Sequence, residues 1–158
     1  MQIELRNIAF CEALSHDSTA YAAEVWIDGQ LAFHTRNHGL GGADIIDRAG
    51  RWSEDEVNAW LETNRQPRTV EGVRFDPDLE SEIWMLLTRE LEYRRLKDLL
   101  PSHVVTVEHG RIYHYPLRRH GREKVESAVL AANPDALILR AEDETALRRA
   151  AEILVTQL

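Results

Sequence analysis

The sequence predicts an α+β fold in which an antiparallel sheet carries helices on one face. Period-two alternation of apolar residues fills much of the first third of the chain, which is typical of half-buried strands. An Asp-Gly pair and a His-Gly pair stand between such segments, where tight hairpin turns need residues that adopt positive φ. The middle and the end of the chain carry apolar residues at helical spacing. The expected element order is βββααββαβα.

The first three strands are expected to form an antiparallel meander over roughly residues 2–36. The alternation of the first strand shifts phase at Asn7, which indicates a bulge. A second alternating segment covers residues 21–27, and Asp28 and Gly29 lead directly into a third. Because both residues of that pair tolerate positive φ, the pair predicts a two-residue hairpin turn.

Two helices are expected in the middle of the chain. Ser53 and Glu56 have the spacing of a capping box, in which each side chain binds the backbone of the other residue. The second helix is expected to begin with Asp76 as its cap and Pro77 at its first position. It should end ahead of Pro101, since proline cannot continue a helix.

The last third of the chain predicts a second hairpin followed by βα elements. Two β-rich segments flank His109 and Gly110, which indicates another tight turn. A short helix is expected over residues 122–132, a buried strand over 136–139 and a closing helix over 142–158.

Length and charge limit the function classes. The 158 residues suit one domain, residues 1–158, with the region of Pro101 as the one candidate for a subdomain joint. The 19 basic and 27 acidic residues give a net charge of −8. Such an acidic chain disfavours nucleic-acid binding through a broad basic surface.

Cysteine usage and hydropathy bear on location. The single cysteine, Cys11, excludes an intramolecular disulfide and suits a reducing compartment. It follows an apolar stretch, so we expect a buried side chain. The N-terminus lacks the features of a signal peptide, and no apolar stretch approaches the ~20 residues that span a bilayer. We therefore expect a cytoplasmic protein without a membrane partner.

The best candidate site is the only glycine cluster, residues 37–44. Successive glycine amides could form an anion-binding nest, with nearby cationic side chains adding positive charge. The segment matches neither the phosphate loop of nucleotide hydrolases nor the dinucleotide fingerprint. A tight connection between sheet and helix also explains the glycines and is the favoured interpretation, and the ligand-binding interpretation stays open beside it. The candidate ligand-binding residues are Arg36, Asn37, His38, Gly39, Gly41, Gly42 and Asp44.

Other chemistry-bearing patterns are incomplete. His34, His38, Asp44 and Asp47 match no closed metal template, so we predict no metal ion and no cofactor. No serine or cysteine has a recognisable base partner, which leaves an enzymatic role undecided. Residues 111–122 form a local basic patch that suits an acidic partner or a phosphate, or is simply an exposed turn.

Two segments carry a resemblance, VWIDGQLAFHTRNHGLGGAD near the N-terminus and VVTVEHGRIYHY in the last third. The chain resembles small uncharacterised bacterial and phage-associated proteins with an N-terminal β-meander and a Gly-x-Gly-Gly loop. The resemblance spans most of the chain and rests on Asp28-Gly29 and residues 38–42. It implies no activity and supplies no catalytic residues.

The leading expectation is a non-enzymatic interaction or accessory protein of a bacterium or its phage, with a protein partner. It rests on the absence of a complete catalytic set from an ordinary globular sequence. The alternative is a small-molecule or phosphate-binding protein, enzymatic or not, that uses residues 37–44 together with Arg36.

Overall fold

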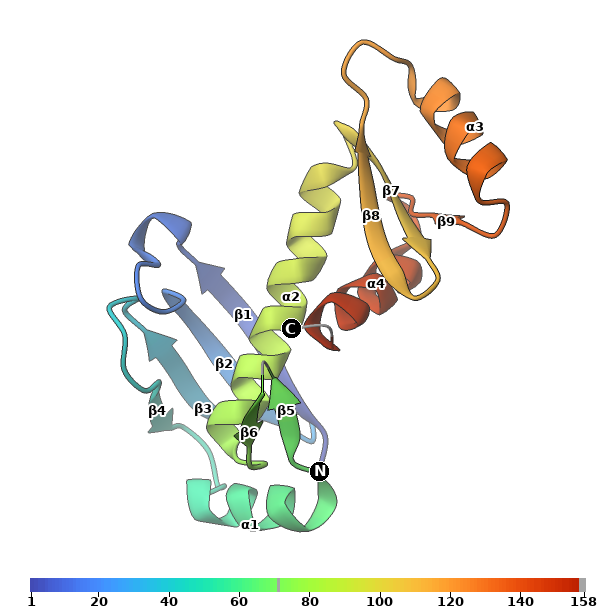
Figure 1. Cartoon of the computed structure of the whole chain (residues 1–158). Coiled ribbons are helices and arrows are strands. Elements are labelled where there is room, and N and C mark those ends of the chain that lie inside the picture. The colour runs from blue at the N-terminus through green and yellow to red at the C-terminus, as the bar shows by residue number, and fades with distance from the viewer. Residues whose placement is uncertain (71, 157–158) are drawn as a thin grey trace. The chain divides into compact units, whose positions relative to one another are not determined.

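A computed structural model describes residues 1–70 and 72–156 (Figure 1). The chain divides into two compact units, unit 1 (Met1–Leu86) and unit 2 (Leu87–Leu158). The division falls within helix α2 (Leu79–Leu99). Helices and antiparallel sheets occur in both units, so the α+β class is confirmed. The single domain with a joint near residue 101 stays a prediction.

Unit 1 is built on a four-stranded antiparallel sheet, sheet A. The three predicted strands form, but the sheet is wider than the predicted meander because a fourth strand pairs with the third. This strand is short and mostly exposed, so its sequence carries little apolar alternation. In sheet order the strands are β1 (Ile3–Phe10), β2 (Tyr21–Ile27), β3 (Gln30–Asn37) and β4 (Ile45–Arg48).

The register of sheet A follows the sequence expectations. Ile27 pairs with Gln30 across the Asp28-Gly29 turn, whose φ angles are 49° and 77°. The β1–β2 register shifts between Arg6 and Ala9, which confirms the predicted bulge at Asn7. The fully buried side chains of β2 and β3 form part of the core of unit 1; they include Val25, Ile27, Ala32 and Phe33.

Helix α1 (Glu54–Asn64) begins as predicted. The Ser53 hydroxyl accepts a hydrogen bond from the Glu56 amide at 3.3 Å, and the Ser53 amide donates to the Glu56 carboxylate at 2.8 Å. The capping box is therefore confirmed. A hairpin of β5 (Arg68–Val70) and β6 (Val73–Phe75) follows. It was not predicted, because strands of three residues are too short to show a periodicity.

Helix α2 begins two residues later than predicted, and the expected cap at Asp76 is wrong. The Asp78 carboxylate accepts a hydrogen bond from the Ser81 amide at 2.7 Å, which is the bond of a capping residue. Asp76 instead binds the Arg74 guanidinium at 3.1 Å. The Leu79 amide donates to the Asn58 side chain at 2.7 Å, which ties the start of α2 to α1.

Unit 2 contains a three-stranded antiparallel sheet in the order β8-β7-β9. The predicted hairpin is confirmed, since Glu108 pairs with Arg111 across the His109-Gly110 turn. The strands are β7 (His103–Glu108), β8 (Arg111–Pro116) and β9 (Leu137–Ile138), and the helices are α3 (Arg122–Ala132) and α4 (Glu144–Thr156). The core comprises Tyr93, Leu96, Leu100, Val105, Leu139, Leu147, Ala150 and Ala151.

The expectation that Cys11 is buried is wrong, because its thiol is exposed. Cys11 lies past the end of β1 and precedes the 3₁₀ turn η1 (Glu12–Leu14). Its backbone is held in place, since its amide donates to the Ala20 carbonyl at 3.0 Å. The chain has left the sheet at this point, and the apolar stretch in the sequence therefore does not continue into the core.

Within residues 1–70 and 72–156, no helix combines the length and the apolarity needed to cross a bilayer.

Candidate functional site

The glycine cluster forms a loop of left-handed backbone between β3 and β4. Gly39, Gly41 and Gly42 have φ angles of 81°, 80° and 95°. A Cβ atom on Gly39 would lie 2.0 Å from the carbonyl oxygen of Leu14, so only glycine fits there. A Cβ atom on Gly42 would meet nothing within 4 Å. Gly39 is therefore required by a close approach of two loops, whereas Gly42 is required only by its backbone conformation.

The buried side chain of Asn37 organises this loop. Its Oδ1 accepts hydrogen bonds from the Ser18 hydroxyl at 2.7 Å and from the Gly39 amide at 2.9 Å. Its Nδ2 donates to the Gly42 carbonyl at 3.2 Å and to the Asp44 carboxylate at 2.9 Å. Both lone-pair directions of the oxygen and both protons of the amide are thus used within unit 1.

The glycine loop is also bonded to the segment that precedes β2. The Gly39 carbonyl accepts the amides of His16 and Asp17 at 3.0 and 3.1 Å. The Gly41 amide donates to the Ser18 hydroxyl at 3.1 Å. The amides of Gly39 and Gly41 therefore bind inside the protein, and an anion nest built on these two donors would first have to break those bonds.

Asp44 closes the loop on the sheet. Its carboxylate accepts the Tyr21 hydroxyl, which also lies 2.9 Å from the Thr35 hydroxyl. Burial raises the pKa of Tyr21, and the hydrogen bond to Asp44 raises it further. The Asp44 amide donates to the Glu80 carboxylate at 3.0 Å. The loop thus ends among carboxylates, which repel an anion.

The two basic candidates of the site lie apart from this network. The Arg36 guanidinium forms an ion pair with Asp47 on the neighbouring strand. His38 is exposed. The structure therefore joins Asn37 with Gly39, Gly42 and Asp44, and it leaves the two basic side chains outside the hydrogen-bonded loop. The ligand-binding role of the seven candidate residues stays a prediction.

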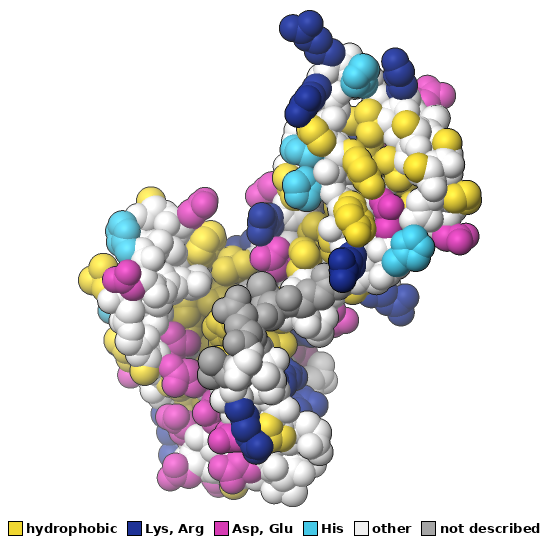
Figure 2. Space-filling view, viewed as in Figure 1, with side chains coloured by type: hydrophobic (Ala, Val, Ile, Leu, Met, Phe, Trp, Pro, Cys, Tyr) yellow, Lys and Arg dark blue, Asp and Glu magenta, His cyan; other side chains and the backbone are white. Residues whose placement is uncertain are grey.

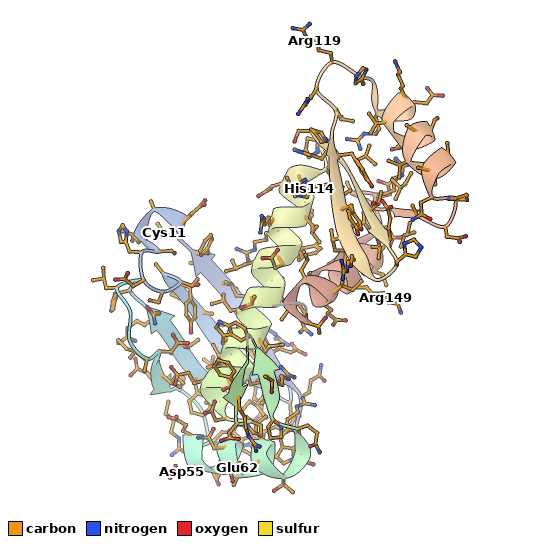
Figure 3. The ribbon with its side chains drawn as sticks, in the orientation of Figure 1. Cys11, Asp55, Glu62, His114, Arg119 and Arg149 are labelled. Carbon is orange, nitrogen blue, oxygen red and sulfur yellow. The ribbon has the colours of Figure 1, made fainter. Side chains whose placement is uncertain are left out.

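An apolar feature that the sequence analysis missed adjoins the glycine loop. Leu40 is 71% exposed and Leu14 is 57% exposed. The backbone of Leu14 touches Gly39, so both leucines belong to the same end of sheet A, which we call the tip surface. Figure 3 labels Cys11 at this end of the unit, and Figure 2 shows apolar and histidine side chains there. The position of Leu40 between glycines could have indicated its exposure, since glycines next to a leucine have no side chains to cover it.

Potential metal ligands do not cluster in the described part of the chain. Among the residues that the structure describes, no group of three or more His, Cys, Asp or Glu side chains could hold a metal ion. The rings of His103 and His114 have centroids 5.5 Å apart and meet edge to face.

Comparisons with protein-family models, with curated proteins and with solved structures found no match. The resemblance to bacterial and phage-associated proteins, the cytoplasmic location and the identity of a partner stay predictions.

Proposed function

We propose that this chain is a non-enzymatic interaction protein, an accessory protein of a bacterium or its phage, and that unit 1 binds a protein partner through the tip surface. The observation that carries the proposal is the 71% exposure of Leu40 on a loop fixed by internal hydrogen bonds. A large apolar side chain on a flexible loop could fold back onto the core. This loop is held outward by the Asn37 side chain and by the contact between Gly39 and Leu14.

Rigidity and exposure together favour binding. A loop that is already ordered loses little conformational entropy when a partner docks. Burying one leucine side chain contributes about 1.5–3 kcal/mol, so two adjoining leucines supply a useful apolar anchor. The glycines then serve to build the loop rather than to contact a ligand.

The charge of unit 1 defines the partner further. Residues 1–86 contain 7 basic and 16 acidic residues, a net charge of −9. Glu12 and Asp17 are exposed beside the two leucines. We therefore infer a protein partner with an apolar recess bordered by lysine or arginine side chains, because complementary charge steers association and disfavours wrong partners.

The test uses site-specific photo-crosslinking in extracts of the host cell. A crosslinking residue at position 40 should capture a defined protein, whereas the same residue at position 137 should not. Leu137 is the matched control, since it is 50% exposed and lies in unit 2. The captured protein is then purified and titrated against the wild-type chain.

Variants complete the test with the purified partner. Leu40→Ser and Leu14→Ser should each weaken binding at least about tenfold, because each removes apolar burial worth more than 1.4 kcal/mol. Both should leave stability within about 0.5 kcal/mol, as expected for exposed positions. Leu137→Ser should change neither quantity. Equal capture from positions 40 and 137, or unchanged affinity of both tip variants, would contradict the proposal.

A further inference from the structure

The charge of the chain is divided unevenly between its units. Residues 87–158 contain 12 basic and 11 acidic residues, a net charge of +1, although the whole chain carries −8. The expectation that nucleic acid is disfavoured rests on the charge of the whole chain. It does not apply to a local surface of unit 2, because charges more than a Debye length apart, ~8 Å at physiological salt, are largely screened from one another.

Unneutralised cations gather in one part of unit 2, residues 111–124, which we call the basic segment. Glu123 is its only acidic residue. Five arginines elsewhere in unit 2 form ion pairs with carboxylates, whereas within the described residues four cations of the basic segment form none. The paired arginines are Arg89, Arg94, Arg95, Arg140 and Arg148, and the unpaired cations are Arg111, Arg118, Arg119 and Lys124.

The basic segment is anchored at its base. The Arg122 guanidinium donates to the carbonyls of Leu100 and His103, so this arginine fixes the segment on the sheet. The Leu117 amide donates to the Ser102 carbonyl at 3.0 Å, and the His120 amide donates to the Leu117 carbonyl at 2.8 Å. Arg118 and Arg119 are thus presented on a bonded turn, whereas Arg111 begins β8 and Lys124 lies in the first turn of α3. Figure 2 shows the Lys, Arg and His side chains grouped at this end of unit 2.

An exposed aromatic ring accompanies these cations. Tyr113 lies on β8, at the edge of the sheet, and is 42% exposed. Arg111 and His114 on the same strand are also exposed. Tyr115, the next residue on the face of Tyr113, is instead held by a hydrogen bond from its hydroxyl to Glu108 at 2.9 Å. Tyr113 is therefore the exposed ring on which a base can stack. Figure 3 labels His114 on β8 and Arg119 on the turn that follows this strand.

We propose that the basic segment and Tyr113 bind single-stranded nucleic acid. Arg118, Arg119 and Lys124 would contact phosphates, and Tyr113 would stack on a base. An acidic protein surface would pair with the cations, whereas a single strand also offers bases that stack on the exposed ring. An anionic membrane would call for exposed aliphatic side chains beside the cations, and Leu117, the aliphatic residue of the turn, is half-buried. Single-stranded nucleic acid is the ligand that uses both features.

The first experiment measures binding of the full chain to a fluorescent oligothymidylate by anisotropy, from low to physiological salt. Arg118→Ala combined with Arg119→Ala should weaken binding. The slope of log affinity against log salt should become less negative by about 1.4, since each phosphate contact to a single strand contributes about −0.7 to that slope. Arg149→Ala is the matched control, because Arg149 is exposed in α4 and forms no ion pair within the described residues. It should leave the slope unchanged.

The second experiment tests the stacking role. Tyr113→Ala should weaken binding about fivefold or more, whereas Tyr113→Phe should retain it, because phenylalanine keeps the aromatic face. Circular dichroism of both variants checks that the strand is intact. If Tyr113 had only a structural role, Tyr113→Ala would lower the unfolding midpoint of the chain and would weaken binding only through that loss of stability.

Competition identifies the ligand class. Unlabelled oligouridylate should displace the probe, whereas polyglutamate at equal charge should displace it weakly. Equal displacement by polyglutamate, together with insensitivity to Tyr113→Ala, would overturn the proposal in favour of an acidic protein partner. Binding to phosphatidylserine vesicles but not to the oligonucleotide would overturn it in favour of a membrane. No binding at about 50 mM salt, where phosphate contacts are strong, would also overturn it.

Discussion

Asn37 shows how one buried amide fixes a loop of several glycines. Its side-chain oxygen accepts two hydrogen bonds and its side-chain nitrogen donates two, one of them to the Asp44 carboxylate. An aspartate has the same shape but cannot donate. Substitution there leaves two carboxylates facing each other at the distance of the present 2.9 Å hydrogen bond.

Asn37→Asp should therefore destabilise unit 1 by more than about 2 kcal/mol at pH 7. The repulsion raises the pKa of the carboxylate pair in the folded state above its value in the unfolded chain. The native state then binds more protons, so the deficit shrinks as pH falls through the raised pKa and grows as pH rises. Urea unfolding at several pH values measures this. Gln30→Glu, which adds the same charge at an exposed position, is the control, and an equal loss in both variants would refute the mechanism.

Gly39 and Gly42 are glycines for different reasons: a Cβ atom at Gly39 would clash with another loop, whereas Gly42 is needed only for its positive φ. Gly39→Ala places a methyl group 2.0 Å from the Leu14 carbonyl oxygen, so the cost should exceed about 3 kcal/mol or prevent folding of unit 1. Gly42→Ala meets no neighbour within 4 Å and should cost only about 1 kcal/mol for its positive φ. Denaturant titration of both variants gives the comparison. Equal losses would mean that the two loops do not touch.

At the scale of elements, the sequence predicted two hairpin turns and the cap of α1 correctly, because particular residue types are required at those positions. The Asp28-Gly29 and His109-Gly110 turns and the Ser53 cap need specific residues, and all three were identified. Elements defined by pairing alone were missed. Strand β4 and the β5–β6 hairpin are too short to show a period, and only their partners on the sheet or hairpin define them.

The sequence identified the residues of the candidate site but not the hydrogen bonds that connect them. The sequence locates Asn37, the glycines and Asp44, and it cannot show that Ser18 and Tyr21 supply their partners from another part of the chain. The exposure of Leu14 depends on where the chain leaves the sheet, and only the fold specifies that.

The capping box of α1 can be tested from both of its partners. Ser53→Ala removes the acceptor of the Glu56 amide and should lower stability by about 1 kcal/mol. The hydrogen bond from the Ser53 backbone lowers the pKa of Glu56, so the stabilisation from its carboxylate is present at neutral pH and is lost as pH falls through that lowered pKa. The stability difference between wild type and Glu56→Gln should therefore vanish in acid. A difference that is constant with pH would contradict this.

At the scale of the whole molecule, the two compact units predict separable unfolding. All four tryptophans, Trp26, Trp52, Trp60 and Trp84, lie in unit 1. Tryptophan fluorescence therefore reports on unit 1, while far-ultraviolet circular dichroism reports on both units. We expect the two transitions in urea to differ in midpoint, as they do when unfolding is not two-state.

Core variants assign the transitions. Leu147→Ala removes a fully buried side chain of unit 2 and should cost about 2–5 kcal/mol. It should shift the dichroism transition and leave the fluorescence midpoint in place. Leu61→Ala, at a fully buried position of unit 1, should shift the fluorescence midpoint instead. Identical shifts of both signals in either variant would show that the units unfold together.

The exposed thiol of Cys11 has a practical consequence for the tip surface. The chain has one cysteine, and the Leu14 amide donates to the Cys11 carbonyl at 3.2 Å, which holds that thiol close to the proposed docking residues. A maleimide dye would therefore attach at a single known position on the native chain without any engineered residue. The same attachment would sterically hinder a docking partner. Alkylation of Cys11 would therefore block binding at the tip surface without a mutation, and it would leave the basic segment of unit 2 unmodified.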